Sequence, residues 1–170
     1  MRIDERHLDV YLTGVAELLE RYGVGLRLPS DGEDLELLED DEGVLSFELL
    51  GDLQDGPDPT RATVVVREAF SPAGDGTWIR SRYEYELLDR ARDYRRAFHL
   101  HFPEWFESAY MVVVHEHCER PVGHSDCDHY EGSPVRDAYA GIEALLRTWT
   151  ADPPDCSALR CLDPDPARRT

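Results

Sequence analysis

The sequence contains no lysine, so its 18 basic residues are all arginine, and they stand against 36 aspartates and glutamates. The formal charge of -18 repels phosphate over the surface as a whole, which argues against bulk attraction to nucleic acid or to anionic membranes. No segment approaches the roughly 20 apolar residues of a membrane-spanning helix, and the N-terminus is charged and amphipathic instead of an apolar signal core. These absences predict a cytoplasmic protein that makes no membrane contact.

Familiar catalytic motifs are missing as well. The chain has no glycine-rich phosphate loop, no Gly-x-Ser-x-Gly nucleophile elbow and no His-Glu-x-x-His zinc helix. The run 31–42 holds eight acids and no base, but it lacks the spaced ligands and central glycine of an EF-hand calcium loop. Motifs therefore identify no substrate.

The charge is unevenly distributed along the chain. Residues 1–60 hold 17 acids and 4 arginines, whereas residues 61–100 hold 6 acids and 8 arginines. Arginines mixed with aromatic residues suit single-stranded nucleic acid. The favoured alternative is an ordinary sheet face on which arginines pair with neighbouring carboxylates. The candidate nucleic-acid-binding residues are Arg80, Arg82, Arg92, Arg95 and Arg96.

Two amphipathic helices are predicted, one toward each end of the chain. Apolar residues from Leu8 to Tyr22 recur in steps of three and four, with Asp4 as a candidate N-cap and Gly23 at the C-terminal end. A second apolar stripe runs from Val135 to Trp149. We expect its helix to start at Ser133-Pro134, because serine caps helices and proline suits the first helical position.

The middle of the chain alternates strand-like runs with turn-like clusters. Val44–Leu50, Ala62–Phe70 and Thr77–Leu88 are rich in β-branched and aromatic residues. With two histidine-bearing strands further on, they predict an antiparallel meander of about five strands. The fold class is therefore α+β, with an N-terminal helix, the meander and a C-terminal helix packed on the sheet. Residues 1–150 form one domain, and residues 151–170 form a proline-rich tail whose cysteines offer a means of docking.

Histidines concentrate in one part of the chain, since six of the seven lie between His99 and His129. Side chains alternate faces along a strand, so the histidines of each strand share a face. If residues 103–109 form a hairpin loop, the two strands are antiparallel neighbours and their histidines converge. These four histidines are the candidate catalytic residues, acting either as general acids and bases or as ligands of a metal that activates water: His99, His101, His115 and His117.

A second group of metal-ligating side chains follows immediately. Zinc favours four nitrogen or sulfur donors in a tetrahedron, and a short polar loop supplies two of each: Cys118, His124, Cys127 and His129. Cys156 and Cys161 are alternative ligands that would join the first two cysteines in an all-cysteine site. Two disulfides are the alternative to any thiolate site. Zn²⁺ is the predicted cofactor, in a structural role.

The order of elements around this loop resembles the TumE-type toxins of toxin-antitoxin systems. The resemblance covers about residues 80–150 and is carried by Tyr83-x-Tyr85-x-Leu87, by His124-Ser125-Asp126-Cys127-Asp128-His129-Tyr130-x-Gly132 and by Leu145-Leu146 in the closing helix. It implies a meander, a histidine-bearing loop and a terminal helix. It also implies a ribonuclease in which His124 and His129 take the place of the family's loop histidines.

Three classes of function follow from these patterns. The first is an acidic binding or regulatory module with a zinc-binding loop. The second is a TumE-like ribonuclease that acts on RNA. The third is an acidic antitoxin-like or nucleic-acid-mimicking protein whose carboxylates meet a partner with a basic surface. The sequence leaves the oligomeric state open.

Overall fold

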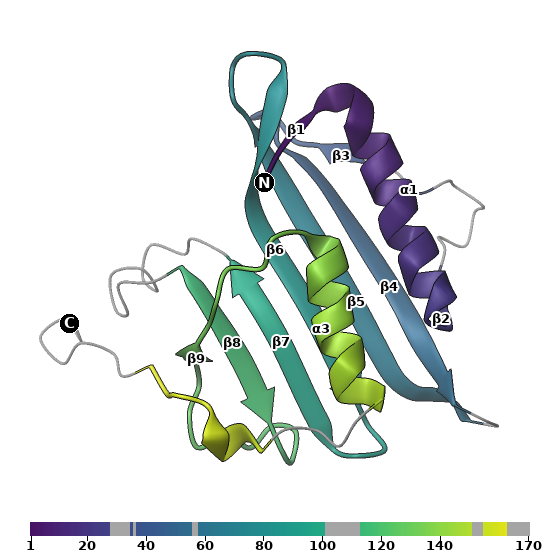
Figure 1. Cartoon of the computed structure of the whole chain (residues 1–170), viewed down its shortest axis with the longest axis vertical. Coiled ribbons are helices and arrows are strands. Elements are labelled where there is room, and N and C mark those ends of the chain that lie inside the picture. Colours follow the sequence, from purple (N-terminus) through teal and green to yellow (C-terminus); the bar gives the residue numbers. More distant parts are fainter. Residues whose placement is uncertain (28–34, 36, 56–57, 101–112, 151–154, 163–170) are drawn as a thin grey trace, which may run out of the picture.

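The fold is α+β, built on one antiparallel sheet that carries two helices on the same face (Figure 1). The computed structural model describes residues 1–27, 35, 37–55, 58–100, 113–150 and 155–162. Within these residues the sheet has nine strands, and its main path runs β2-β4-β5-β6-β7-β8-β9. The two remaining strands attach beside this path, β1 on β6 and β3 on β4.

The centre of the sheet is a meander in which each strand pairs with the next. It consists of β4 (Leu45–Asp55), β5 (Asp58–Pro72), β6 (Thr77–Asp89), β7 (Tyr94–Leu100) and β8 (Val114–Glu119). The predicted meander is therefore present, and β7 and β8 are the two histidine-bearing neighbours.

The predicted count of about five strands is wrong because four short strands extend the sheet. These are β1 (Arg2–Asp4), β2 (Val24–Leu26), β3 (Leu38–Glu39) and β9 (Tyr130–Glu131). A strand of two or three residues is too short to show an alternating pattern in the sequence. β9 extends the sheet beyond β8 and so becomes important for the histidine site.

Helix α1 (Glu5–Arg21) forms where the apolar stripe predicted it. Asp4 caps its N-terminus, because its side chain accepts a hydrogen bond from the backbone N–H of Arg6. Gly23 follows the C-terminal end with φ of 79°, a left-handed conformation that costs glycine little. The stripe is buried against β4 and β5 and includes Leu8, Leu12, Val15 and Leu19.

Helix α3 (Ala138–Thr150) packs beside α1 on β5, β6 and β7. It begins later than the predicted start at Ser133-Pro134. The Val135 N–H donates to the Tyr83 hydroxyl, and the Val135 carbonyl, which a helix starting at Pro134 would pair with a later N–H, accepts from Arg80 instead. Asp137 caps the helix in their place, accepting from the Ala140 N–H at 3.0 Å.

A buried ion pair lies beneath the two helices. Arg80 Nη1 is 2.8 Å from Glu68 Oε1, and the two side chains are 4% and 0% exposed. The Tyr85 hydroxyl donates to the same carboxylate and accepts from Arg80 at 2.7 Å. Burial raises the pKa of Glu68, while the hydrogen bonds from Tyr85 and Arg80 oppose that rise. This network ties β5 and β6 to the segment that leads into α3.

Candidate metal centre

Four imidazole rings gather on the face of the sheet opposite the helices. His99 lies in β7 and pairs in register with His115 in β8. His117 is two residues further along β8 and therefore points to the same side as His115. The fourth ring belongs to His129, which immediately precedes β9. The predicted convergence of the strand histidines is thus present for the three that the structure describes, whereas His101 lies outside the described residues.

The rings are close enough to share one ion. One nitrogen from each of His99, His115 and His117 lies within 4.8 Å of the other two. The His99 and His117 ring centroids are 4.7 Å apart. The His129 ring centroid is 5.0 Å from those of both His115 and His117. His129 therefore lies beside the three strand histidines, although its nitrogens are not part of the group whose donor atoms all lie within 4.8 Å of one another.

Burial differs from one end of this histidine cluster to the other. His99 and His115 are 7% and 0% exposed, whereas His117 and His129 are partly exposed. Burial lowers the pKa of His117 to about 4, with further contributions from the charges of Arg95 and His129. Its ring also hydrogen-bonds to the backbone of Asp128. His117 is therefore neutral at pH 7, which is the protonation state that binds metals.

The open end of the cluster adjoins a cavity of about 360 Å³. His117 and His129 line this cavity together with Glu119, Asp128, Gly123 and Ser125. Such a cavity gives an ion from solvent a path to the imidazoles. Glu119 is paired with Arg95, which shares its single charge between Glu119 and Glu86, so with Asp128 the cavity keeps a net negative charge that attracts cations and repels anions.

Charged side chains surround the cluster on the same face. Glu84 Oε1 is 4.0 Å from His99 Nε2, and Glu84 and Glu86 form a second group of metal-capable donors with His99, within 4.8 Å of one another. Arg67 pairs with Glu84 at 3.0 Å and Arg95 pairs with Glu86 at 2.7 Å. These guanidinium groups already occupy oxygens of Glu84 and Glu86, so the imidazoles are the more accessible ligands.

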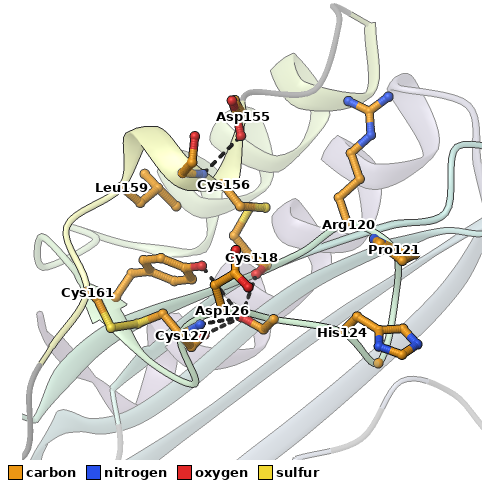
Figure 2. A pocket seen from close by; sticks show the side chains of 14 residues that line it. Cys118, Arg120, Pro121, His124, Asp126, Cys127, Asp155, Cys156, Leu159 and Cys161 are labelled. Atoms are coloured by element: carbon orange, nitrogen blue, oxygen red, sulfur yellow. Dashed lines mark hydrogen bonds between the residues drawn. A yellow bond between two sulfur atoms is a disulfide. The ribbon is translucent and has the colours of Figure 1, made fainter.

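The cysteines do not form the predicted zinc site. Cys118 is bonded to Cys156 and Cys127 to Cys161, so both disulfides attach the C-terminal segment to the β8–β9 region (Figure 2). A sulfur in a disulfide is not a thiolate, which is the form that ligates zinc. The proposed four-cysteine metal site fails for the same reason. Disulfides are typical of oxidising compartments and rare in the cytosol, so the pairing counts against the predicted cytoplasmic location.

The two loop histidines of the predicted site are separated. His129 joins the strand histidines, whereas His124 is exposed, lines the cavity beside the disulfides and points away from both of them (Figure 2). The turn between β8 and β9 therefore divides the predicted Cys-His set between two places. The residue spacing does not distinguish the two histidines, because spacing alone does not show where a turn ends.

The candidate nucleic-acid-binding arginines do not form one surface. Arg95 and Arg96 are consecutive in β7 and so point to opposite faces. Arg95 pairs with Glu86 and Glu119 on the histidine side, while Arg96 pairs with Glu116 on the helix side. Arg80 is buried beneath the helices, and Arg92 pairs with Asp89 and donates to the Trp149 carbonyl. Arg82 is exposed. Ion pairing therefore accounts for Arg80, Arg92, Arg95 and Arg96.

Comparisons of the chain with protein-family models, with curated proteins and with solved structures found no match. The resemblance to TumE-type toxins accordingly stays a prediction. Neither helix in the described part of the chain combines the length and apolar character that a membrane span requires.

Proposed function

We propose that this protein is a metal-binding module that holds a divalent transition-metal ion, most naturally Zn²⁺, through His99, His115, His117 and His129. The observation that carries the proposal is the convergence of one nitrogen from each of the first three histidines within 4.8 Å. Zn–N bonds of about 2.0–2.1 Å in a tetrahedron place the nitrogens roughly 3.4 Å apart. Small rotations of the rings would therefore bring the donors to bonding distance.

The donor set selects the class of ion. Neutral imidazoles suit zinc, copper, nickel and iron, whereas calcium and magnesium prefer oxygen ligands. The nearest carboxylates, Glu84 and Glu86, already pair with Arg67 and Arg95. A hard cation would have to displace these guanidinium groups, whereas a transition ion would use the imidazoles directly.

Burial favours a fixed site with one accessible end. His99 and His115 are held by the β7–β8 ladder and are nearly inaccessible, which limits the rearrangement that metal binding requires. His117 and His129 face the 360 Å³ cavity. This arrangement supports binding of an ion from solvent followed by its retention, as in a structural or regulatory metal site.

The ribonuclease alternative has less support. Cleavage of RNA by these histidines would need nearby cations to stabilise charge on phosphate. Arg95, on the histidine face, is paired with two glutamates, and Glu119 and Asp128 line the adjoining cavity. An acidic cavity beside the imidazoles suits a metal ion better than a phosphodiester.

The proposal is tested by metal content and affinity. The purified protein would be stripped with a chelator, dialysed against Zn²⁺ and analysed for metal, and its Kd would be measured by competition with a chromogenic chelator. We expect one zinc per chain, and weakening by more than roughly tenfold in His117→Ala. His7→Ala removes an exposed histidine from α1 and should leave the Kd unchanged. Absence of bound zinc, or equal affinity in the two variants, would overturn the proposal.

A further inference from the structure

We propose that the Cys127–Cys161 disulfide controls the affinity of the metal centre, so that its reduction weakens metal binding by releasing His129. The inference rests on the proposed function and concerns the regulation of the same site. It depends on how the chain holds His129, the one member of the histidine cluster that lies outside β7 and β8.

The strand that follows His129 has little support of its own. β9 contains two residues, and it pairs with β8 at two positions, His115 with Glu131 and Glu116 with Tyr130. A pairing this short is marginal without support from a further strand. By contrast, β7 and β8 pair along six positions, which fixes His99, His115 and His117.

The C-terminal segment supplies the missing support on the outer side of β9. The Glu131 N–H donates to the Arg160 carbonyl at 2.8 Å, and the Leu162 N–H donates to the carbonyl of His129 itself at 2.9 Å. Between these two bonds, Tyr130 and Cys161 form an antiparallel bridge. Residues 160–162 thus act as an outer strand that holds the backbone on both sides of β9.

The Cys127–Cys161 disulfide anchors this outer strand at the bridge. Cys127 is two residues before His129, and Cys161 is the partner of Tyr130 in the bridge. The disulfide joins two residues that are 34 positions apart in the sequence. Without it, these two residues would be free to separate when the chain unfolds or opens. Its loss leaves the two backbone hydrogen bonds of the Tyr130–Cys161 bridge to hold residues 160–162 against β9, so the position of His129 becomes less defined.

The disulfide is open to a reductant. Both disulfides line a cavity of about 800 Å³ at the surface, and Cys161 is exposed while Cys127 is 8% exposed (Figure 2). A thiolate of dithiothreitol attacks the Cys161 sulfur, and Cys127 leaves as a thiolate that takes up a proton. The second thiol of dithiothreitol then displaces Cys161 as a thiol and closes to the cyclic disulfide. Two electrons and two protons pass to the protein.

The second disulfide provides a matched control. Cys118 lies in β8, whose ladder with β7 includes the pair Arg96 with Cys118 and fixes that strand without help from the Cys118–Cys156 bond. Its side chain also points to the opposite side of the sheet from His117, because the two residues are consecutive in the strand. Removing this bond should therefore disturb the histidine cluster less than removing the other.

The experiment measures the Kd for Zn²⁺ in the full chain and in three variants. Cys127→Ser/Cys161→Ser should raise the Kd by roughly tenfold or more, and Cys118→Ser/Cys156→Ser should change it by less than about threefold. His129→Ala in the disulfide-bonded protein should reproduce the loss. Adding His129→Ala to Cys127→Ser/Cys161→Ser should then cause little further loss, because both changes act through the same ligand.

Several outcomes would overturn the proposal. These are an unchanged Kd in Cys127→Ser/Cys161→Ser, an equal loss in the two cysteine pairs, or additive losses in the combined variant. A Co²⁺-loaded protein that gains a thiolate charge-transfer band on reduction would also contradict it, since sulfur would then replace His129. Absence of metal from the disulfide-bonded protein would be a different result, because it refutes the metal centre itself. Serine variants avoid dependence on full reduction, and far-UV circular dichroism checks that each remains folded.

Discussion

The buried Glu68–Arg80 pair offers a sharp test of how the sheet and helices are held together. Glu68→Gln preserves the shape of the side chain and its ability to accept a hydrogen bond from Tyr85, but it leaves Arg80 as a buried charge with no counter-charge. Both side chains of the pair are at most 4% exposed. Breaking a buried pair from one side costs about 3–5 kcal/mol.

The loss should be visible in thermal unfolding. For a chain of 170 residues, each kcal/mol corresponds to about 2–4 °C, so we expect Tm to fall by roughly 6–20 °C. Glu48→Gln is the matched control, because Glu48 pairs with Arg67 on the same sheet at exposures of 51% and 45%. Exposed pairs contribute about 0–1 kcal/mol. Urea titrations monitored by circular dichroism would give the loss of unfolding free energy in each variant. Equal losses in the two variants would refute the assigned role of burial.

Three further perturbations test other parts of the structure. Burial raises the pKa of Tyr85 and of Tyr11 above the ordinary 10.0, so the folded chain retains protons that the unfolded chain releases. Urea titrations should show stability falling as pH rises above 10, and less steeply in Tyr85→Phe; identical slopes would contradict this. The excess of 17 acids over 4 arginines in residues 1–60 predicts a Tm that rises from tens of millimolar to molar KCl, because ions screen self-repulsion. Glu39→Gln/Asp41→Asn/Glu42→Gln should reduce that rise, and a flat Tm would mean that the acids are already balanced. Gly132→Ala would place a Cβ 2.9 Å from the Cα and carbonyl carbon of His115. Calorimetry should therefore show a loss of about 1–3 kcal/mol in unfolding free energy, and zinc binding should weaken. Ser133→Ala, the control, should show neither effect.

The sequence was sufficient for the parts of the fold that repeat a pattern. Apolar steps of three and four residues located α1, and alternating residues located the meander and put His115 and His117 on one face. The same alternation argues against a single arginine surface, since Arg95 and Arg96 are adjacent in β7 and must diverge. Charge pairing, which the sequence favoured for these arginines, is what the structure shows for Arg80, Arg92, Arg95 and Arg96.

The remaining features depend on contacts between distant residues. β9 becomes a strand because it lies between β8 and residues 160–162, and this pairing brings His129 to the cluster. The start of α3 is delayed by side chains of β6, which hydrogen-bond to the backbone of Val135. The cysteine spacing was compatible with either zinc or disulfides, and only the docking of the C-terminal segment distinguishes them.

X-ray absorption at the zinc edge of the loaded, disulfide-bonded protein tests the metal centre most directly. A site made by His99, His115, His117 and His129 should give a first shell of nitrogen at about 2.0–2.1 Å with the multiple scattering of imidazole rings, and His115→Ala should remove part of that signal. A sulfur shell at about 2.3 Å, or a shell of oxygen alone, would contradict the histidine centre.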